Sequence, residues 1–159
     1  MIQQITINDA LLKAAKEVFE TMIFMDLEES SDPLHQIQGE ALLGSITFKG
    51  EIEGCMSICC GVSCAKTIAA NMLGMDVDED ISDDDVNDAI GEVANMVMGS
   101  VKKQLHGNIA NLEVSIPSVV SGRELKSNLG ERANRVLVKV NIEDQYTAEL
   151  SFLYREANS

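Results

Sequence analysis

The sequence predicts an α+β fold in a single domain over residues 1–159, with an antiparallel or mixed β-sheet packed against long helices. Three observations lead to this class. Residues 82–107 carry the signals of a long helix at both ends, and four apolar segments pair into two β-hairpins. The chain has 159 residues, 45% of them hydrophobic, which is enough for one core.

Residues 8–27 are expected to form the first helix, with Asn8 as its N-cap. Its apolar positions recur at helical spacing and should face the core. They are Leu11, Leu12, Ala15, Val18, Phe19, Met22 and Ile23. A polar loop over residues 28–33 ends in Asp-Pro, a turn signal.

The next segments, 38–48 and 51–61, are expected to be strands joined at Lys49-Gly50, and residues 63–73 a short helix that Gly74 ends. In the acidic stretch 75–85, aspartates 76, 78 and 80 are spaced like the start of a calcium loop. Ile81 stands where that loop needs glycine, and Asn87 where it needs a bidentate glutamate. A solvated loop leading into a helix is the favoured interpretation.

The helix at 82–107 has an N-cap, Ser82, followed by three aspartates at the positive end of the helix dipole. Basic residues gather near its other end: Lys102, Lys103 and His106. Gly107 is expected to end the helix in the left-handed conformation. One side of the helix is apolar and should face the core: Val86, Ile90, Val93, Val97, Val101 and Gln104, with Leu105 at its margin.

The opposite side of this helix holds Asp88, Glu92, Asn95 and Gly99. Glu92 and Asn95 are three residues apart, so a carboxylate and an amide project outward together. Asparagine and glycine are poor helix formers, and an inert solvated face would not need them. This face is therefore the candidate functional site.

Residues 112–116 are expected to form a short strand, residues 117–122 a turn and residues 124–134 an exposed loop. Segments 135–142 and 146–154 should form the second hairpin, which turns near Glu143-Asp144. Residues 17–22 can be laid on residues 92–97, which indicates two helix-plus-hairpin halves related by approximate twofold symmetry. In this alignment Glu20 stands opposite Asn95.

Charge and composition exclude several classes of protein. A net charge of −14 offers no basic patch to nucleic acid or to an anionic membrane surface. There is neither a membrane-length apolar run nor a signal peptide, so a cytoplasmic protein is expected. The four cysteines, at 55, 59, 60 and 64, lack zinc spacing and do not share one face of a strand, which favours buried free thiols over a metal site.

The segment from Asp88 to Gly99 resembles the Glu-x-x-Asn signature helix of the CheC/CheX/FliY family of chemotaxis phosphatases, with Glu92 and Asn95 at the signature positions. Residues 116–122, Ile-Pro-Ser-Val-Val-Ser-Gly, resemble the Pro-x-Val-Val-x-Gly segment of the CheX branch. The order of elements matches over nearly the whole chain. With Glu20 opposite Asn95, only one copy of the signature is intact, which is typical of the CheX branch.

The resemblance implies hydrolysis of the aspartyl phosphate on a phosphorylated CheY-type receiver domain. In this interpretation Asn95 orients the attacking water and Glu92 pairs with the receiver's active-site lysine. Asp88 and Gly99 let the helix dock, and Met96 touches the partner. The protein needs no cofactor of its own, because the receiver holds Mg²⁺.

A homodimer joined edge to edge through its sheets is also implied, with the final hairpin as the open edge. Two alternatives stay open. One is a non-catalytic receiver-binding or flagellar-switch module with the same fold, and the other is a metal or redox protein built on the cysteines.

Overall fold

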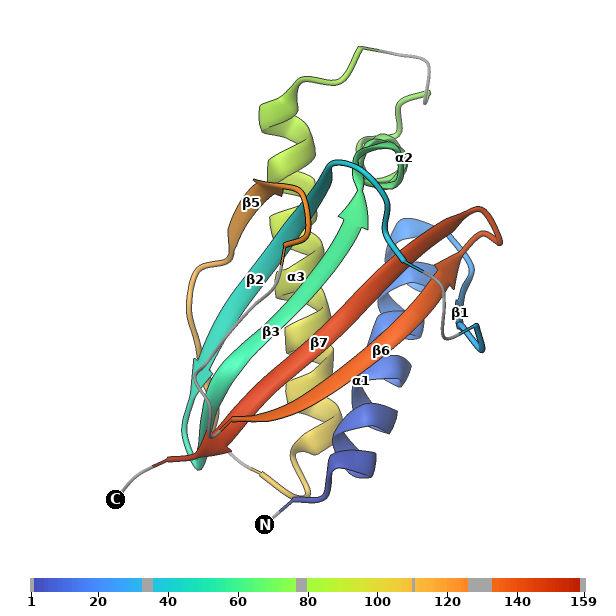
Figure 1. Ribbon diagram of the computed structural model, residues 1–159. Coiled ribbons are helices and arrows are strands. Elements are labelled where there is room, and N and C mark those ends of the chain that lie inside the picture. The colour runs from blue at the N-terminus through green and yellow to red at the C-terminus, as the bar shows by residue number, and fades with distance from the viewer. Residues whose placement is uncertain (1, 33–35, 77–79, 110, 126–132, 158–159) are drawn as a thin grey trace.

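A computed structural model describes residues 2–32, 36–76, 80–109, 111–125 and 133–157, and they form a seven-stranded antiparallel sheet with two long helices on one face (Figure 1). The helical segments are α1 (Gln4–Val18), the π-helical turn η1 (Phe19–Ile23), α2 (Val62–Leu73) and α3 (Asp83–Leu105). The strands are β1 (Leu27–Glu29), β2 (Ala41–Lys49), β3 (Ile52–Gly61), β4 (Glu113–Val114), β5 (Ser118–Gly122), β6 (Asn134–Ile142) and β7 (Tyr146–Glu156). The predicted α+β class is confirmed.

The strand order confirms the predicted twofold arrangement. The sheet runs β1-β6-β7-β3-β2, with β4 and β5 both paired to the outer side of β2. The hairpins β2–β3 and β6–β7 meet at the centre, where Ile58 pairs with Leu150. Each half supplies a helix, a hairpin and a short outer strand, and each outer strand pairs with the hairpin of the other half: β1 with β6, and β5 with β2.

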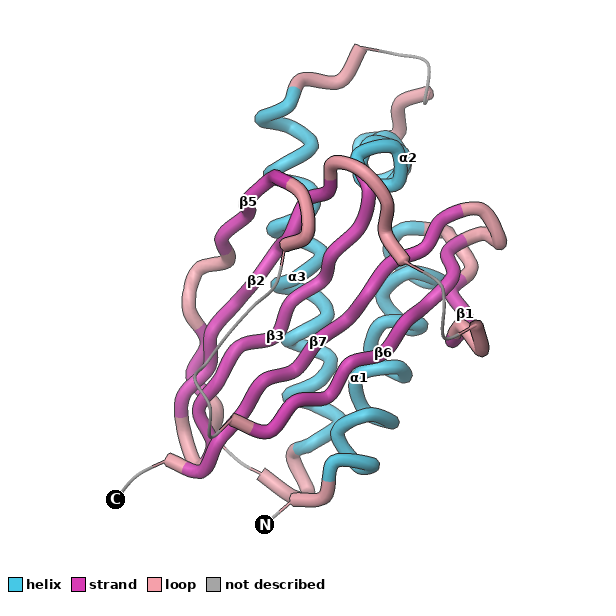
Figure 2. Tube along the Cα trace, viewed as in Figure 1, coloured by secondary structure: helices cyan, strands magenta, loops and turns pink. Residues whose placement is uncertain are grey.

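The core lies between the sheet and the two long helices, which Figure 2 shows behind the strands. α1 packs against β6 and α3 against β2, and the two helices contact each other. Alternate strand residues point toward the helices, and the rings of Phe48 and Phe152 stack there at 4.7 Å between centroids. On the other face, the hydroxyls of Ser57 and Ser151 are hydrogen-bonded to each other from paired positions on β3 and β7.

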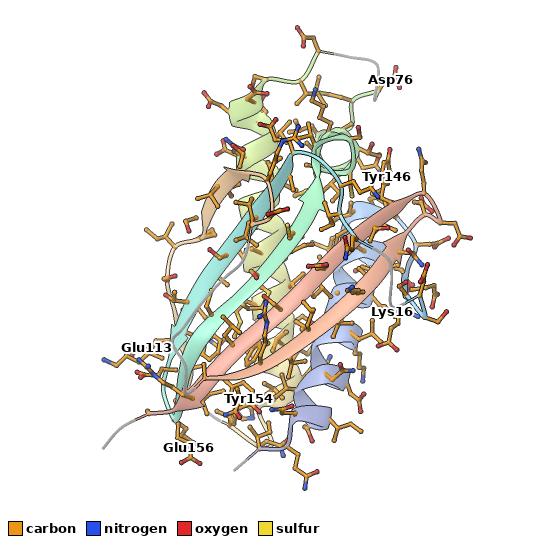
Figure 3. All side chains as sticks on the ribbon, viewed as in Figure 1. Lys16, Asp76, Glu113, Tyr146, Tyr154 and Glu156 are labelled. Atoms are coloured by element: carbon orange, nitrogen blue, oxygen red, sulfur yellow. The ribbon has the colours of Figure 1, made fainter. Side chains whose placement is uncertain are left out.

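α2 closes one end of the sheet. The hydroxyls of Thr67, on this helix, and Tyr146, at the start of β7, lie 2.8 Å apart. Figure 3 labels Tyr146 at this end of the sheet. At the far end of α2, the Asn71 side-chain amide donates to the Ile23 carbonyl at 3.2 Å. Gly74 then ends the helix with a φ of 67°, as expected.

The prediction for the first helix was wrong at both ends. The helix begins at Gln4, so Asn8 lies inside it, and Gln3 precedes it without a side-chain cap. Near the other end, the π-helical turn η1 rotates the apolar face, and Met22 is 57% exposed although its spacing predicted burial. Phe24, with a φ of 62°, ends the helical segment.

Two other predictions were also wrong. Segment 117–122 was expected to be a turn, but its last five residues form strand β5 on the edge of β2. Gly107 does not adopt the left-handed conformation. α3 ends instead in a tight turn, in which the Leu105 carbonyl accepts from Asn108 N at 2.8 Å and Ile109 N at 2.7 Å.

The second hairpin is as predicted, and Glu143 and Asp144 turn it with φ values of 56° and 53°. Two other expectations fall partly on residues outside the described ranges: the calcium-like spacing at 76–80 and the loop at 124–134. Within the described ranges, no helix is long and apolar enough to span a bilayer.

Candidate functional site on helix α3

The two ends of α3 carry the charges that the helix dipole favours. The Ser82 hydroxyl accepts a hydrogen bond from Asp85 N at 3.1 Å, as predicted for an N-cap. Three aspartates occupy the first turn and two lysines the last. The helix is therefore defined by local sequence at its N-terminus and held by packing along its length.

Glycines set the position of α3 relative to the sheet. A Cβ on Gly44 of β2 would lie 2.9 Å from Ile90 Cγ2 and 3.1 Å from the Ile90 carbonyl oxygen. On the helix itself, a Cβ on Gly91 would meet Val119 Cγ2 at 3.5 Å and Pro117 Cγ at 3.7 Å. The helix thus lies directly on β2 and against the edge strand, one residue before Glu92.

The outward face of α3 carries the candidate residues in the expected arrangement. Asp88, Glu92, Asn95 and Gly99 are all exposed. The apolar residues of the stripe on the other side are buried, whereas Gln104, which was expected to share it, is only partly buried. Met96 is half-buried and packs against the core at the margin of this face. Nothing lies within 4 Å of the Cβ position of Gly99, so the turn after Asn95 is open.

This arrangement suits recognition of a large partner. Glu92 and Asn95 are one turn apart on a convex surface, with Cβ atoms about 5–6 Å apart by helical geometry. The carboxylate accepts hydrogen bonds only, while the amide both donates and accepts, so the pair can hold a cation and a water side by side. A small substrate would need a concave site, which a helix face does not provide.

Cys59 and Cys60 lie on opposite faces of β3, as predicted. Cys60 points into the helix-side core with Cys64 of α2, and Cys59 lies on the opposite face. Burial, with a smaller contribution from the Glu149 carboxylate, raises the pKa of Cys59 to about 11. A hydrogen bond with Cys64, followed by burial, raises the pKa of Cys60. Among the described residues, no group of three or more His, Cys, Asp or Glu side chains is arranged to hold a metal ion.

The buried thiols should resist alkylation in the native protein. Because the thiolate is the reactive form, raised pKa values and burial both slow attack at Cys59 and Cys60. We expect iodoacetamide at pH 8 to label these two residues only after denaturation, as measured by mass spectrometry. Rapid labelling of Cys60 in the folded protein would contradict this.

Sequence reasoning missed one feature beside the site. Residues 113–122 form a nearly continuous edge strand along β2, and Ile116 within it is 89% exposed. Pro117 marked this stretch as a turn, although proline also occurs at strand edges and bulges. An isoleucine before a proline was the only signal, and it does not distinguish a turn from an edge strand.

The fold and the site define an α+β domain that presents a polar pair on an exposed helix face. The chain belongs to the family described as chemotaxis phosphatase CheX, whose model matches residues 42–141. The matched residues include all of α3, with Glu92 and Asn95.

Solved structures of similar fold come from several bacteria. Chemotaxis protein CheX from Vibrio vulnificus is 22% identical with a TM-score of 0.81, and the match covers 98% of this chain and 100% of that one. A CheX from Desulfovibrio desulfuricans is 20% identical with a TM-score of 0.78, covering 94% and 99%. The structure of a CheX–CheY–BeF3–Mg²⁺ complex from Borrelia burgdorferi matches at 22% identity and a TM-score of 0.74, covering 98% and 100%. No curated protein sequence matches the chain.

Proposed function

We propose that this protein hydrolyses the aspartyl phosphate of a CheY-type receiver domain in chemotaxis signalling. The observation that carries the proposal is the exposed Glu92–Asn95 pair on a helix held against the sheet at Gly91. Membership of the CheX family supports phosphatase activity. The similar Borrelia burgdorferi structure, a complex with CheY, supports a receiver as the partner.

In the proposed reaction, a water molecule attacks the phosphorus of the acyl phosphate. The bond between phosphorus and the aspartyl oxygen breaks, which releases inorganic phosphate and restores the receiver's carboxylate. Asn95 holds the attacking water in line through its amide, a contribution of orientation rather than of acid–base chemistry. Glu92 pairs with the receiver's lysine and fixes the helix over the phosphorylated site.

The remaining residues of the face contribute to docking. Gly99 leaves its turn open, so that the partner's backbone can approach α3 closely. Asp88 adds negative charge one turn before Glu92, and Met96 offers a flexible apolar contact at the margin. The Mg²⁺ ion belongs to the receiver, and the protein supplies no cofactor of its own.

The test is the decay of a phosphorylated CheY-type receiver from the same organism, followed with and without this protein. Faster decay with turnover, so that one molecule dephosphorylates many receivers, is the expected result. Binding of the phosphorylated receiver with an unchanged phosphate lifetime would overturn the phosphatase proposal and favour a non-catalytic adaptor.

We also propose a homodimer joined along the outer edge of β6. β7 lies inside the sheet, between β6 and β3, so only β6 of the final hairpin offers an edge. β1 pairs with the last three residues of β6, and Ser30 N adds a bond to the Lys139 carbonyl at 2.8 Å. Within the described ranges no strand pairs with the outer side of the first residues of β6, and Leu137 there is 43% exposed.

Light scattering at micromolar concentration is expected to give twice the monomer mass. Leu137→Glu should yield monomers, because a charge on the edge opposes strand pairing. Leu73→Glu is the matched control, since Leu73 is 51% exposed at the end of α2, away from that edge. A monomeric mass for the unmodified protein would refute the dimer.

A further inference from the structure

The edge strand beside α3 contains a one-residue β-bulge. Val114 pairs with Phe48, and Ser118 pairs with Ser45. Between these pairs β2 has two residues, whereas the edge strand has three, Ser115 to Pro117. The extra residue interrupts the ladder, which is why β4 and β5 are separate strands.

The bulge is held in place by hydrogen bonds. Ser115 N donates to the Thr47 carbonyl at 2.9 Å, and the Ser115 hydroxyl accepts from Thr47 N at 3.0 Å. The same hydroxyl donates to the Ile116 carbonyl at 3.1 Å. A side chain thereby satisfies the backbone donor that the interrupted ladder would leave unpaired. Bulges of this kind re-aim side chains and are frequent next to active sites.

Ile116 belongs to this bulge, and 89% of its surface is exposed. Val114, which pairs with Phe48 and so lies on the helix side of the same edge, is 41% exposed. Pro117 faces Gly91 of α3, with Cγ 3.7 Å from the position of a Cβ there. We call Val114, Ile116 and Pro117 the apolar shoulder. The free energy gained on burying an isoleucine is proportional to the apolar area removed from water. An isoleucine that is exposed to solvent is therefore a candidate contact for a protein partner.

Pro117 of the shoulder lies at the flank of α3 nearest Asn95. At 100° per residue, Gly91 lies on one side of the Glu92–Asn95 pair, next to Asn95, and Met96 lies on the other side, next to Glu92. The Pro117 ring faces Gly91, with Cγ 3.7 Å from the position that a Cβ would take there. The polar pair therefore lies between Pro117 on one side and Met96 on the other. Figure 1 shows β5 and the segment before it alongside the first half of α3.

The exposed face of α3 is too small and too polar to hold a protein partner alone. A stable interface buries about 800 Å² on each side, with 20–30 residues and an apolar centre. The outward positions Asp88, Glu92, Asn95 and Gly99 supply a few polar contacts. The shoulder supplies exposed apolar area on the strand whose Pro117 faces Gly91 of α3.

We infer that Ile116, carried by the bulge, docks onto an apolar patch of the phosphorylated receiver domain beside its phosphorylation site. This inference rests on the proposed function, because the occupant is the receiver on which Glu92 and Asn95 would act. Ile116 contributes binding only and does not touch the reacting atoms. Removing it therefore weakens the complex without slowing the chemical step within it.

The experiment compares the protein with its Ile116→Ser variant in steady-state hydrolysis of the phosphorylated receiver, and in binding to the receiver activated by beryllofluoride. We expect KM and the dissociation constant to rise about tenfold, with kcat unchanged. Ile116→Leu should restore both. Ile5→Ser is the matched control, because Ile5 is 66% exposed in the first turn of α1.

Each outcome decides the matter. An unchanged KM for Ile116→Ser, or a lower kcat with unchanged KM, overturns the docking role while the phosphatase stands. If the unmodified protein neither hydrolyses the phosphorylated receiver nor binds it, the proposed function is refuted. The docking of Ile116 onto the receiver is then refuted as well, because it rests on that function. A thermal melt that matches the unmodified protein confirms that Ile116→Ser is folded.

Discussion

Replacing Asn95 by alanine is expected to lower the rate of receiver dephosphorylation by about 100-fold or more, because in the proposed reaction the attacking water loses the amide that orients it. The side chain is exposed, and alanine is the better helix former, so stability should not fall. Binding to the beryllofluoride-activated receiver should remain close to that of the unmodified protein. The measurement is phosphate release at saturating receiver, paired with a binding titration.

Glu92→Ala is the variant to compare with Asn95→Ala. Loss of a charge-assisted contact with the receiver's lysine should weaken binding about tenfold or more, whereas Asn95→Ala acts on the rate within the complex. The two substitutions on one helix face are thus expected to differ in which step they affect. Normal hydrolysis by Asn95→Ala would remove the water-positioning role.

Gly54→Ala is expected to lower the free energy of unfolding by about 3 kcal/mol. A Cβ on this buried residue of β3 would lie 1.8 Å from the Leu153 carbonyl oxygen and 2.8 Å from Phe48 Cζ. Neither neighbour has room to move, because Leu153 belongs to the central strand β7 and Phe48 stacks on Phe152. The melting temperature should fall by roughly 6–12 °C.

Gly99→Ala makes the same chemical change where nothing lies within 4 Å of the new methyl group. It should stabilise the protein by about 1 kcal/mol, since alanine favours the helix. Denaturant unfolding of both variants therefore tests whether the room for the new methyl group, or the backbone preference of alanine, decides if the free energy of unfolding falls or rises. A loss of less than about 1 kcal/mol for Gly54→Ala would mean that β3 and β7 separate easily.

Elements with strong local signals could be predicted from the sequence. α3 has a serine cap, an acidic first turn and a regular apolar stripe, and its observed start agrees with the predicted one. Both hairpins and the end of α2 at Gly74 follow from alternation and from turn residues. The outward position of Glu92 and Asn95 required only the helical period.

The failures occur where tertiary packing overrides local signals. Asn8 looked like an N-cap, yet the apolar face of α1 extends back to the buried Ile7. The edge strand β5 could not be predicted from residues 117–122 alone, because its partner β2 lies far away in the chain. The same reason hid the apolar shoulder, since a bulge exists only relative to the strand that it faces.

The exchange of outer strands between the two halves has a consequence for how the chain folds. Neither half can complete its own sheet. β1 of the first half pairs with β6 of the second, and β2 of the first half has β5 of the second as its outer neighbour. The central pairing of β3 with β7 also joins residues distant in the chain, such as Ile58 and Leu150. Such contacts cost loop-closure entropy before they stabilise anything, which slows folding. The two halves should therefore form in one cooperative transition, and a chain cut between α2 and α3 should regain structure only when both fragments are mixed.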